Sequence, residues 1–140
     1  MTAEGAVFAI DGSCVAGLSD DDIIRLIFTQ ADQLPMEFAR EAVSRGGRIV
    51  PALAEAARLP CNWHRSDAGW CAVVHAVFLM GEISGVAVIE PLMDALRLAE
   101  EYENPWVSEA LPAIFGRLGP RTLRGLRALA LDPCSDFMLI

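Results

Sequence analysis

The chain has 140 residues and a formal net charge of −8 at pH 7, and 54% of its residues are apolar. This length fits one domain with a hydrophobic core, and so many apolar residues exclude an intrinsically disordered chain. All 11 basic residues are arginine, and the excess of acidic residues argues against nucleic acid as a partner.

The first half of the chain contains signals for four helices. Residues 1–18 show no clear hydrophobic period, so we expect an irregular N-terminal lead before a single domain over residues 19–140. Ser19 with acids in the next turn predicts a capped helix, and Pro35 suits the first turn of the following helix. Asp67 is expected to cap the fourth helix. These helices are predicted at residues 19–31, 35–45, 49–59 and 69–80.

Three further helices are predicted in the second half. Gly81 and Gly85 are expected to bracket the turn after the fourth helix. Asn104 followed by Pro105 is typical of a helix start, and Gly119 marks the next turn. No segment alternates polar and apolar residues, so we expect no β-sheet. The helices of this half are predicted at residues 88–101, 105–118 and 121–131, and a further one can begin at residue 134.

The predicted helices repeat at a regular interval. Trp70 and Trp106 each open a helix and lie 36 residues apart. Pro51 and Pro91 occupy matching positions and lie 40 residues apart. A period of about 35–40 residues with two helices per unit indicates an α-solenoid, in which stacked pairs bury a shared core. We therefore predict an all-α fold, a short right-handed α-α superhelix of about three helical pairs plus a partial cap.

Two segments of this repeat, residues 70–97 and 106–133, resemble HEAT-like repeats of the armadillo-type superfamily. A proline near the start of the second helix is typical of that class. More narrowly, residues 34–57 followed by 72–83 resemble a family of uncharacterised bacterial proteins with short HEAT-like arrays. Some members carry a C-terminal SEC-C zinc motif, which this sequence lacks. The resemblance implies a solenoid fold and is nearly silent on activity.

One cluster carries metal-ligand chemistry, namely Cys61, His64, Cys71 and His75. Thiolates and imidazoles are preferred zinc ligands, and Cys71 and His75 lie one helical turn apart. However, only six residues separate the two halves, and the second half falls inside a repeat helix. We therefore favour a buried cysteine and a hydrogen-bonded histidine over a zinc site. A Cys71–His75 catalytic dyad lacks a glycine-rich turn that would present a nucleophile.

A second group of side chains is a candidate for binding a partner. Three arginines recur every three residues along the last predicted helix, and acids occupy the polar side of the helix at 88–101. In stacked pairs of this class, the second helices line a concave surface. Mutual salt bridges are the favoured interpretation, and a groove for a carboxylate or phosphate group is the alternative. The candidate partner-binding residues are Glu90, Asp94, Arg97, Arg117, Arg121, Arg124 and Arg127.

The predicted function is a non-catalytic module that docks a protein or peptide on the concave face of the solenoid. Stacked pairs give an extended curved surface, whereas enzymes of small molecules need a deep pocket. No cofactor or metal is predicted. The alternatives are an enzyme or chromophore-handling protein similar to the HEAT-like bilin lyases, and a small zinc-binding domain. A DNA binder similar to the HEAT-like glycosylases is disfavoured by the net charge of −8.

The expected location is the cytoplasm. The N-terminus lacks a basic region before a long apolar run, and no uncharged stretch reaches membrane-spanning length. Four scattered cysteines in a chain with an ample core need no disulfide framework, so we expect free thiols. The apolar residues 137–140 could pack back as a cap or join two copies into a homodimer.

Overall fold

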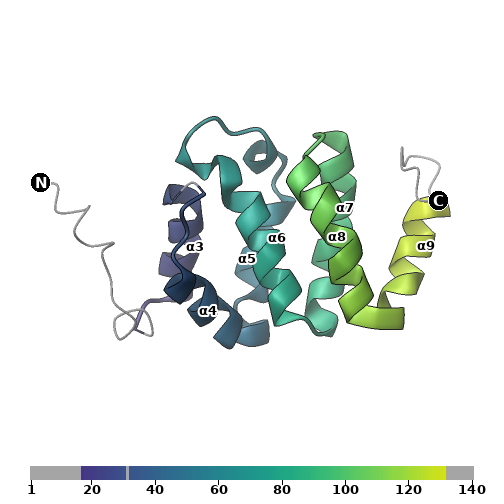
Figure 1. Cartoon of the computed structure of the whole chain (residues 1–140), viewed down its shortest axis with the longest axis horizontal. Helices are drawn as coiled ribbons and strands as arrows, with labels where there is room; N and C mark the ends of the chain where they lie inside the picture. The colour runs from purple at the N-terminus through teal and green to yellow at the C-terminus, as the bar shows by residue number, and fades with distance from the viewer. Residues whose placement is uncertain (1–16, 31, 132–140) are drawn as a thin grey trace, which may run out of the picture.

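The computed structural model describes residues 17–30 and 32–131, and this part of the chain is helical without a β-strand (Figure 1). The all-α prediction is confirmed there. Residues 1–16 of the predicted lead and the further helix from residue 134 lie outside the described residues. The α-helices are α3 (Asp20–Thr29), α4 (Met36–Ser44), α5 (Val50–Arg58), α6 (Ala72–Ile83), α7 (Ile89–Glu101), α8 (Pro105–Leu118) and α9 (Leu123–Leu131).

Short 3₁₀ helices join several of these elements. They are η1 (Gly46–Arg48), η2 (Pro60–Trp63), η3 (Ala68–Cys71), η4 (Val86–Val88) and η5 (Gly119–Thr122). None of the described helices is long and apolar enough to span a membrane.

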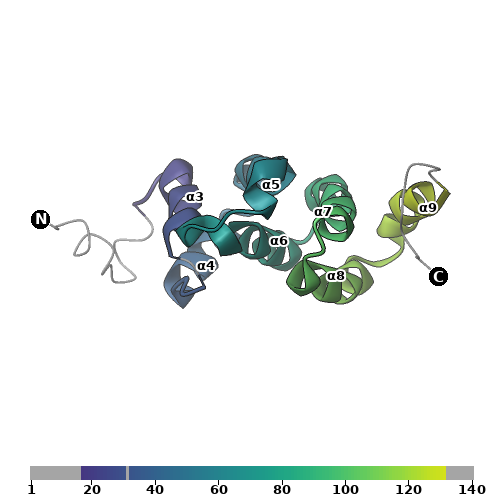
Figure 2. The ribbon, with the colours of Figure 1, turned by 90° about the horizontal axis from the view of Figure 1, so that it is seen from above.

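The helices are arranged in two layers. Seen from above, α3, α5, α7 and α9 form one row, the first layer, and α4, α6 and α8 form the other, the second layer (Figure 2). Successive helices within each row contact one another, and across the rows α5 packs on α6 and α7 on α8. The chain therefore passes alternately from one layer to the other.

The core lies between the layers, where the α-helices from α3 to α8 contribute buried apolar side chains. Leu53 of α5, Val77 of α6, Leu92 of α7 and Leu111 of α8 have no exposed surface. Burying a side chain of this size stabilises the folded state by about 1.5–3 kcal/mol relative to its exposure. This shared core holds the two rows together.

Local capping interactions set several of the helix ends. The Asp22 N–H donates to Ser19 Oγ over 3.1 Å, and the Ser19 N–H donates to Asp22 Oδ2 over 3.2 Å. This reciprocal capping box confirms the predicted start of α3. Asn104 Oδ1 accepts from the Val107 N–H over 3.1 Å, with Pro105 at the first position of α8, as the sequence predicts.

The predicted role of Gly81 in a turn is wrong. Gly81 lies inside α6, and the chain turns at Ser84 and Gly85, whose φ angles are 64° and 88°. A Cβ atom at position 81 would lie 2.8 Å from Ile114 Cδ1 of α8. Gly81 therefore allows close approach of α6 and α8, which are neighbours in the second layer.

The segment between α5 and α6 is fastened to α5 by buried polar side chains. Asn62 Nδ2 donates to the Ala56 carbonyl and Trp63 Nε1 donates to the Ala57 carbonyl, both over 2.8 Å. The guanidinium of Arg65 lies 5.0 Å from the ring centroid of Phe28 in α3. The segment therefore contacts α5, α3 and α6, and these contacts fix the position of η3, which carries Trp70.

Candidate interaction surface

Two tryptophans that are distant in the sequence lie together on the surface, one in η3 just before α6 and the other in α8. The ring centroids of Trp70 in η3 and Trp106 in α8 are 5.9 Å apart, with the rings tilted by 59°. The two residues are nevertheless 38% and 58% exposed. The two rings together form an exposed apolar patch. A patch of this kind on a protein surface commonly marks an interaction site.

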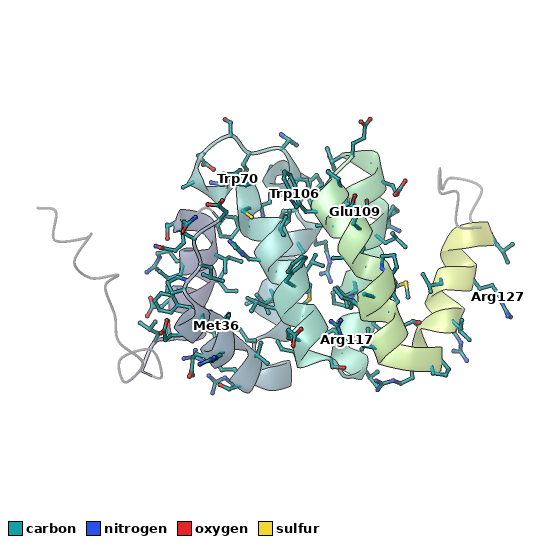
Figure 3. The ribbon with its side chains drawn as sticks, viewed as in Figure 1. Met36, Trp70, Trp106, Glu109, Arg117 and Arg127 are labelled. Atoms are coloured by element: carbon teal, nitrogen blue, oxygen red, sulfur yellow. The ribbon has the colours of Figure 1, made fainter. Side chains whose placement is uncertain are left out.

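A hollow lies on the same side of the molecule, between α6 and α8, the two helices that lie side by side below the labelled tryptophans in Figure 3. Phe78 of α6 is 48% exposed, and Ala110 and Ala113 of α8 lie beside it around a hollow of about 260 Å³. The small alanine side chains leave the hollow open, and Ile114 forms part of its wall. We call Trp70, Phe78, Trp106, Ala110 and Ala113 the α6–α8 surface.

Charged groups border the α6–α8 surface. Arg117 Nη2 lies 3.7 Å from Glu82 Oε2, an exposed ion pair that joins α8 to α6 at the end away from the tryptophans (Figure 3). Glu109 of α8 is exposed along the same helix. The α6–α8 surface is thus apolar around the hollow, with the Glu109 carboxylate and the paired Arg117 on its margins.

The structure divides the predicted partner-binding residues between the two layers. Arg117 belongs to α8 in the second layer, where it lines the hollow beside Phe78. The other six belong to first-layer helices or to the turn before α9. Those six are Glu90, Asp94 and Arg97 on α7, Arg121 in η5, and Arg124 and Arg127 on α9.

Part of the charged first-layer group is paired within the molecule. Asp94 Oδ1 accepts from Arg97 over 3.0 Å, and Asp94 Oδ2 lies 3.6 Å from Nε of Arg58 in α5. Arg121 Nε donates to the Leu118 carbonyl over 3.3 Å. Asp94 is therefore paired within α7 and with Arg58 of α5, which was not among the predicted residues, and not with the arginines of the last helix.

The cysteine and histidine cluster is spread over several environments. Cys61 is exposed in η2, whereas Cys71 is buried in η3. His64 packs against Tyr102 with ring centroids 5.6 Å apart, and His75 is half-buried on α6. The described part of the chain contains no group of three or more His, Cys, Asp or Glu side chains that could hold a metal ion.

Cys71 is poorly suited to act as a nucleophile. Burial raises the pKa of its thiol, and the nearby negative charge of Asp32 raises it further. The reactive form of cysteine is the thiolate, which a raised pKa disfavours at neutral pH.

Sequence reasoning identified Trp70 and Trp106 only as markers of the repeat. Their spacing predicts that they occupy equivalent positions in the repeat. It does not predict on which face of the molecule the two side chains lie or whether they are exposed. Comparison of the chain with protein-family models, curated proteins and solved structures finds no match. The candidate surface therefore rests on its own geometry.

Proposed function

We propose that this protein is a non-catalytic interaction module, built as a short HEAT-like α-solenoid, that binds a protein partner on the α6–α8 surface. The observation that carries the proposal is the contact between Trp70 and Trp106, two rings that pack together yet remain accessible. Tryptophan is among the residues that contribute most to binding energy at protein interfaces. The alternation of layers supports the solenoid arrangement, in which such a surface extends over neighbouring units.

The shape of the surface favours an amphipathic helix as the bound element. The hollow beside Phe78 measures about 260 Å³, below the roughly 300–1,000 Å³ of small-molecule pockets. It can receive one or two apolar side chains of a partner. The exposed apolar side chains of two neighbouring helices, α6 and α8, suit a third helix laid across them with its apolar stripe inward.

Charge selects among such helices. The chain carries a net charge of −8, and Glu109 lies exposed on α8. A partner helix with lysine or arginine on its polar face is attracted to this protein, and a basic side chain can also lie over an exposed tryptophan ring. The proposed partner is thus an amphipathic helix with a basic polar face.

The first-layer charges have a secondary role in this proposal. The sequence predicted docking on the concave side, around Asp94 and Arg97. Asp94 already pairs with Arg58 and Arg97, so a partner there would have to compete with existing ion pairs. Exposed charges such as Glu90 and Arg124 can still alter the rate at which a charged partner associates.

Selection from a displayed library of peptides, tiled across the proteins of the native cell, tests the proposal. We expect basic amphipathic helices to be enriched on the wild-type protein. Their affinity should fall at least about ten-fold for the Trp106→Ala variant, because loss of an interface hot spot costs about 2 kcal/mol or more.

The matched control is Leu123→Ala, which removes an exposed apolar side chain from α9, outside the α6–α8 surface. It should leave the affinity of the enriched helices unchanged. Enriched peptides that bind the Trp106→Ala variant as tightly as the wild-type protein would overturn the proposal, as would enrichment of no helical peptide.

A further inference from the structure

The α6–α8 surface has two ends of different chemistry. At one end, Trp70, just before α6, contacts Trp106 at the start of α8. At the other end, Glu82 and Arg117 meet with 3.7 Å between Oε2 and Nη2, each near the C-terminus of its helix. The contacts follow the order of the chain on both helices, so α6 and α8 run in the same direction beneath the surface (Figure 3).

The hollow lies between these two ends at a definite spacing. Ala113, which lines the hollow, comes seven residues after Trp106 on α8, or about 10 Å along the helix axis. Arg117 follows Ala113 by a further four residues, or about 6 Å. On α6, Glu82 follows Phe78 by the same number of residues. The tryptophans, the hollow and the ion pair are therefore three successive positions on one line.

The three positions differ in the side chains that they can accept. The tryptophan rings form an exposed apolar patch, and the hollow of about 260 Å³ admits an apolar side chain. The side chains of Glu82 and Arg117 are 68% and 55% exposed. An apolar side chain placed over this ion pair would remove two charged groups from water, which is costly. The ion pair therefore ends the part of the surface that attracts apolar side chains.

Charge complementarity favours a basic partner helix over a second copy of this chain. A second copy carries the same net charge of −8 and is repelled. Glu109 is exposed on α8 between Trp106 and Ala113. A lysine or arginine that flanks the apolar stripe of the partner, between its two contacts with this surface, can reach this carboxylate.

We infer, on the basis of the proposed function, that the α6–α8 surface selects partner helices by the spacing of their apolar side chains. The partner carries two apolar anchors, at positions i and i+7, with a basic residue between them. These two positions share one face of a helix and lie about 10 Å apart, which matches the distance from the tryptophans to the hollow. Position i+11 continues this face over the ion pair and is polar. The same spacing can run in either direction along the partner chain.

Designed peptides test the spacing on the full chain. The probe is a hydrocarbon-stapled helix of alanine and lysine with leucines at i and i+7. Its isomer carries the leucines at i and i+5, which lie on different faces of the helix. Fluorescence anisotropy should show at least about ten-fold tighter binding of the i, i+7 probe, since the isomer can fill only one of the two apolar positions. An additional leucine at i+11 should improve the affinity less than about two-fold, because it meets the ion pair.

A variant of this protein tests the hollow itself. Ala113→Leu fills the hollow with a side chain of the protein and should weaken binding of the i, i+7 probe by about ten-fold. The matched control is Ala128→Leu, the same substitution at an exposed position of α9 that does not line the hollow, and it should leave the affinity unchanged. Circular dichroism and urea unfolding verify that both variants retain the fold.

Three outcomes would overturn the inference. They are equal affinities of the i, i+7 and i, i+5 peptides, binding of neither peptide, and an Ala113→Leu variant that binds the probe as tightly as the wild-type protein. The proposed function fails on a different result. Library peptides that depend on Trp106 but lack the seven-residue spacing would preserve the proposed function and remove only the spacing rule.

Discussion

Trp70 and Trp106, 36 residues apart in the chain, pack with ring centroids 5.9 Å apart while both remain accessible to solvent. A tilted aromatic pair contributes about 0.5–1.5 kcal/mol beyond its buried area. A double-mutant cycle of Trp70→Ala and Trp106→Ala, followed by chemical unfolding, should therefore show a coupling energy of about that size. Strictly additive losses would show that the two rings do not stabilise each other.

Alanine substitutions at two glycines, on neighbouring helices of the second layer, should change the stability of the fold in opposite directions. At Gly81, an added methyl group meets Ile114 at 2.8 Å, so Gly81→Ala should destabilise the fold by about 1–3 kcal/mol. At Gly116 of α8 an added Cβ meets no atom within 4 Å, so Gly116→Ala should stabilise it by about 0.5–1 kcal/mol. Urea unfolding measures both. A gain in stability for Gly81→Ala would contradict the close approach of α6 and α8.

Arg45, at the C-terminus of α4, should contribute more to the stability of the fold than the exposed Arg48. The Arg45 side chain is 3% exposed and donates to Asp20 at 2.8 Å, to Glu41 at 2.9 Å and to the Leu18 carbonyl at 2.7 Å. Arg48 reaches the same Asp20 oxygen at 3.1 Å but is 66% exposed.

Replacing each arginine by methionine tests this difference. Arg45→Met should lower the free energy of unfolding by about 1.5–3 kcal/mol, the contribution of hydrogen bonds to charged groups. Arg48→Met should lower it by less than about 1 kcal/mol, as for exposed ion pairs. Equal losses for the two variants would show that burial of Arg45 is not what makes its contacts effective.

Asp67 should make part of the stability depend on acid pH. The hydrogen bond from Arg65, assisted by the Gly69 N–H, lowers the pKa of this carboxyl from 3.8 to about 2. A carboxyl whose pKa is lowered by folding stabilises the protein above its unfolded pKa. This contribution is lost as the pH falls from about 4 towards 2.

Unfolding titrations at several pH values check this expectation. Asp67→Asn keeps an oxygen for the Gly69 N–H but removes the charge that Arg65 binds. The difference in stability between wild type and Asp67→Asn should be present at pH 5 and should shrink as the pH approaches 2. A difference that stays constant over this range would contradict the role of the charged carboxyl.

The helices could be predicted from the sequence because their end signals are local. The Ser19 capping box and the Asn104-Pro105 start involve residues within three positions of each other. The function of Gly81 could not be predicted in the same way. The reason for a glycine there is Ile114, a side chain of another helix that comes close only when the second layer forms.

The candidate site was harder to predict than the fold. Of three tryptophans in the chain, Trp63 is buried with its N–H bonded to Ala57, whereas Trp70 and Trp106 are exposed. Composition and spacing do not distinguish these environments. Likewise, Arg58 pairs with Asp94 only because α5 and α7 are neighbours in the first layer, a relationship set by tertiary packing.

The three tryptophans also provide the most direct test of the proposed function. Their indole N–H groups give separate signals in a ¹H–¹⁵N spectrum, which can be followed during titration with an enriched helical peptide. The signals of Trp70 and Trp106 should shift in proportion to binding, while that of Trp63 stays in place as an internal reference. Binding that leaves both exposed tryptophans unchanged and instead moves signals of α7 and α9 would contradict the proposal.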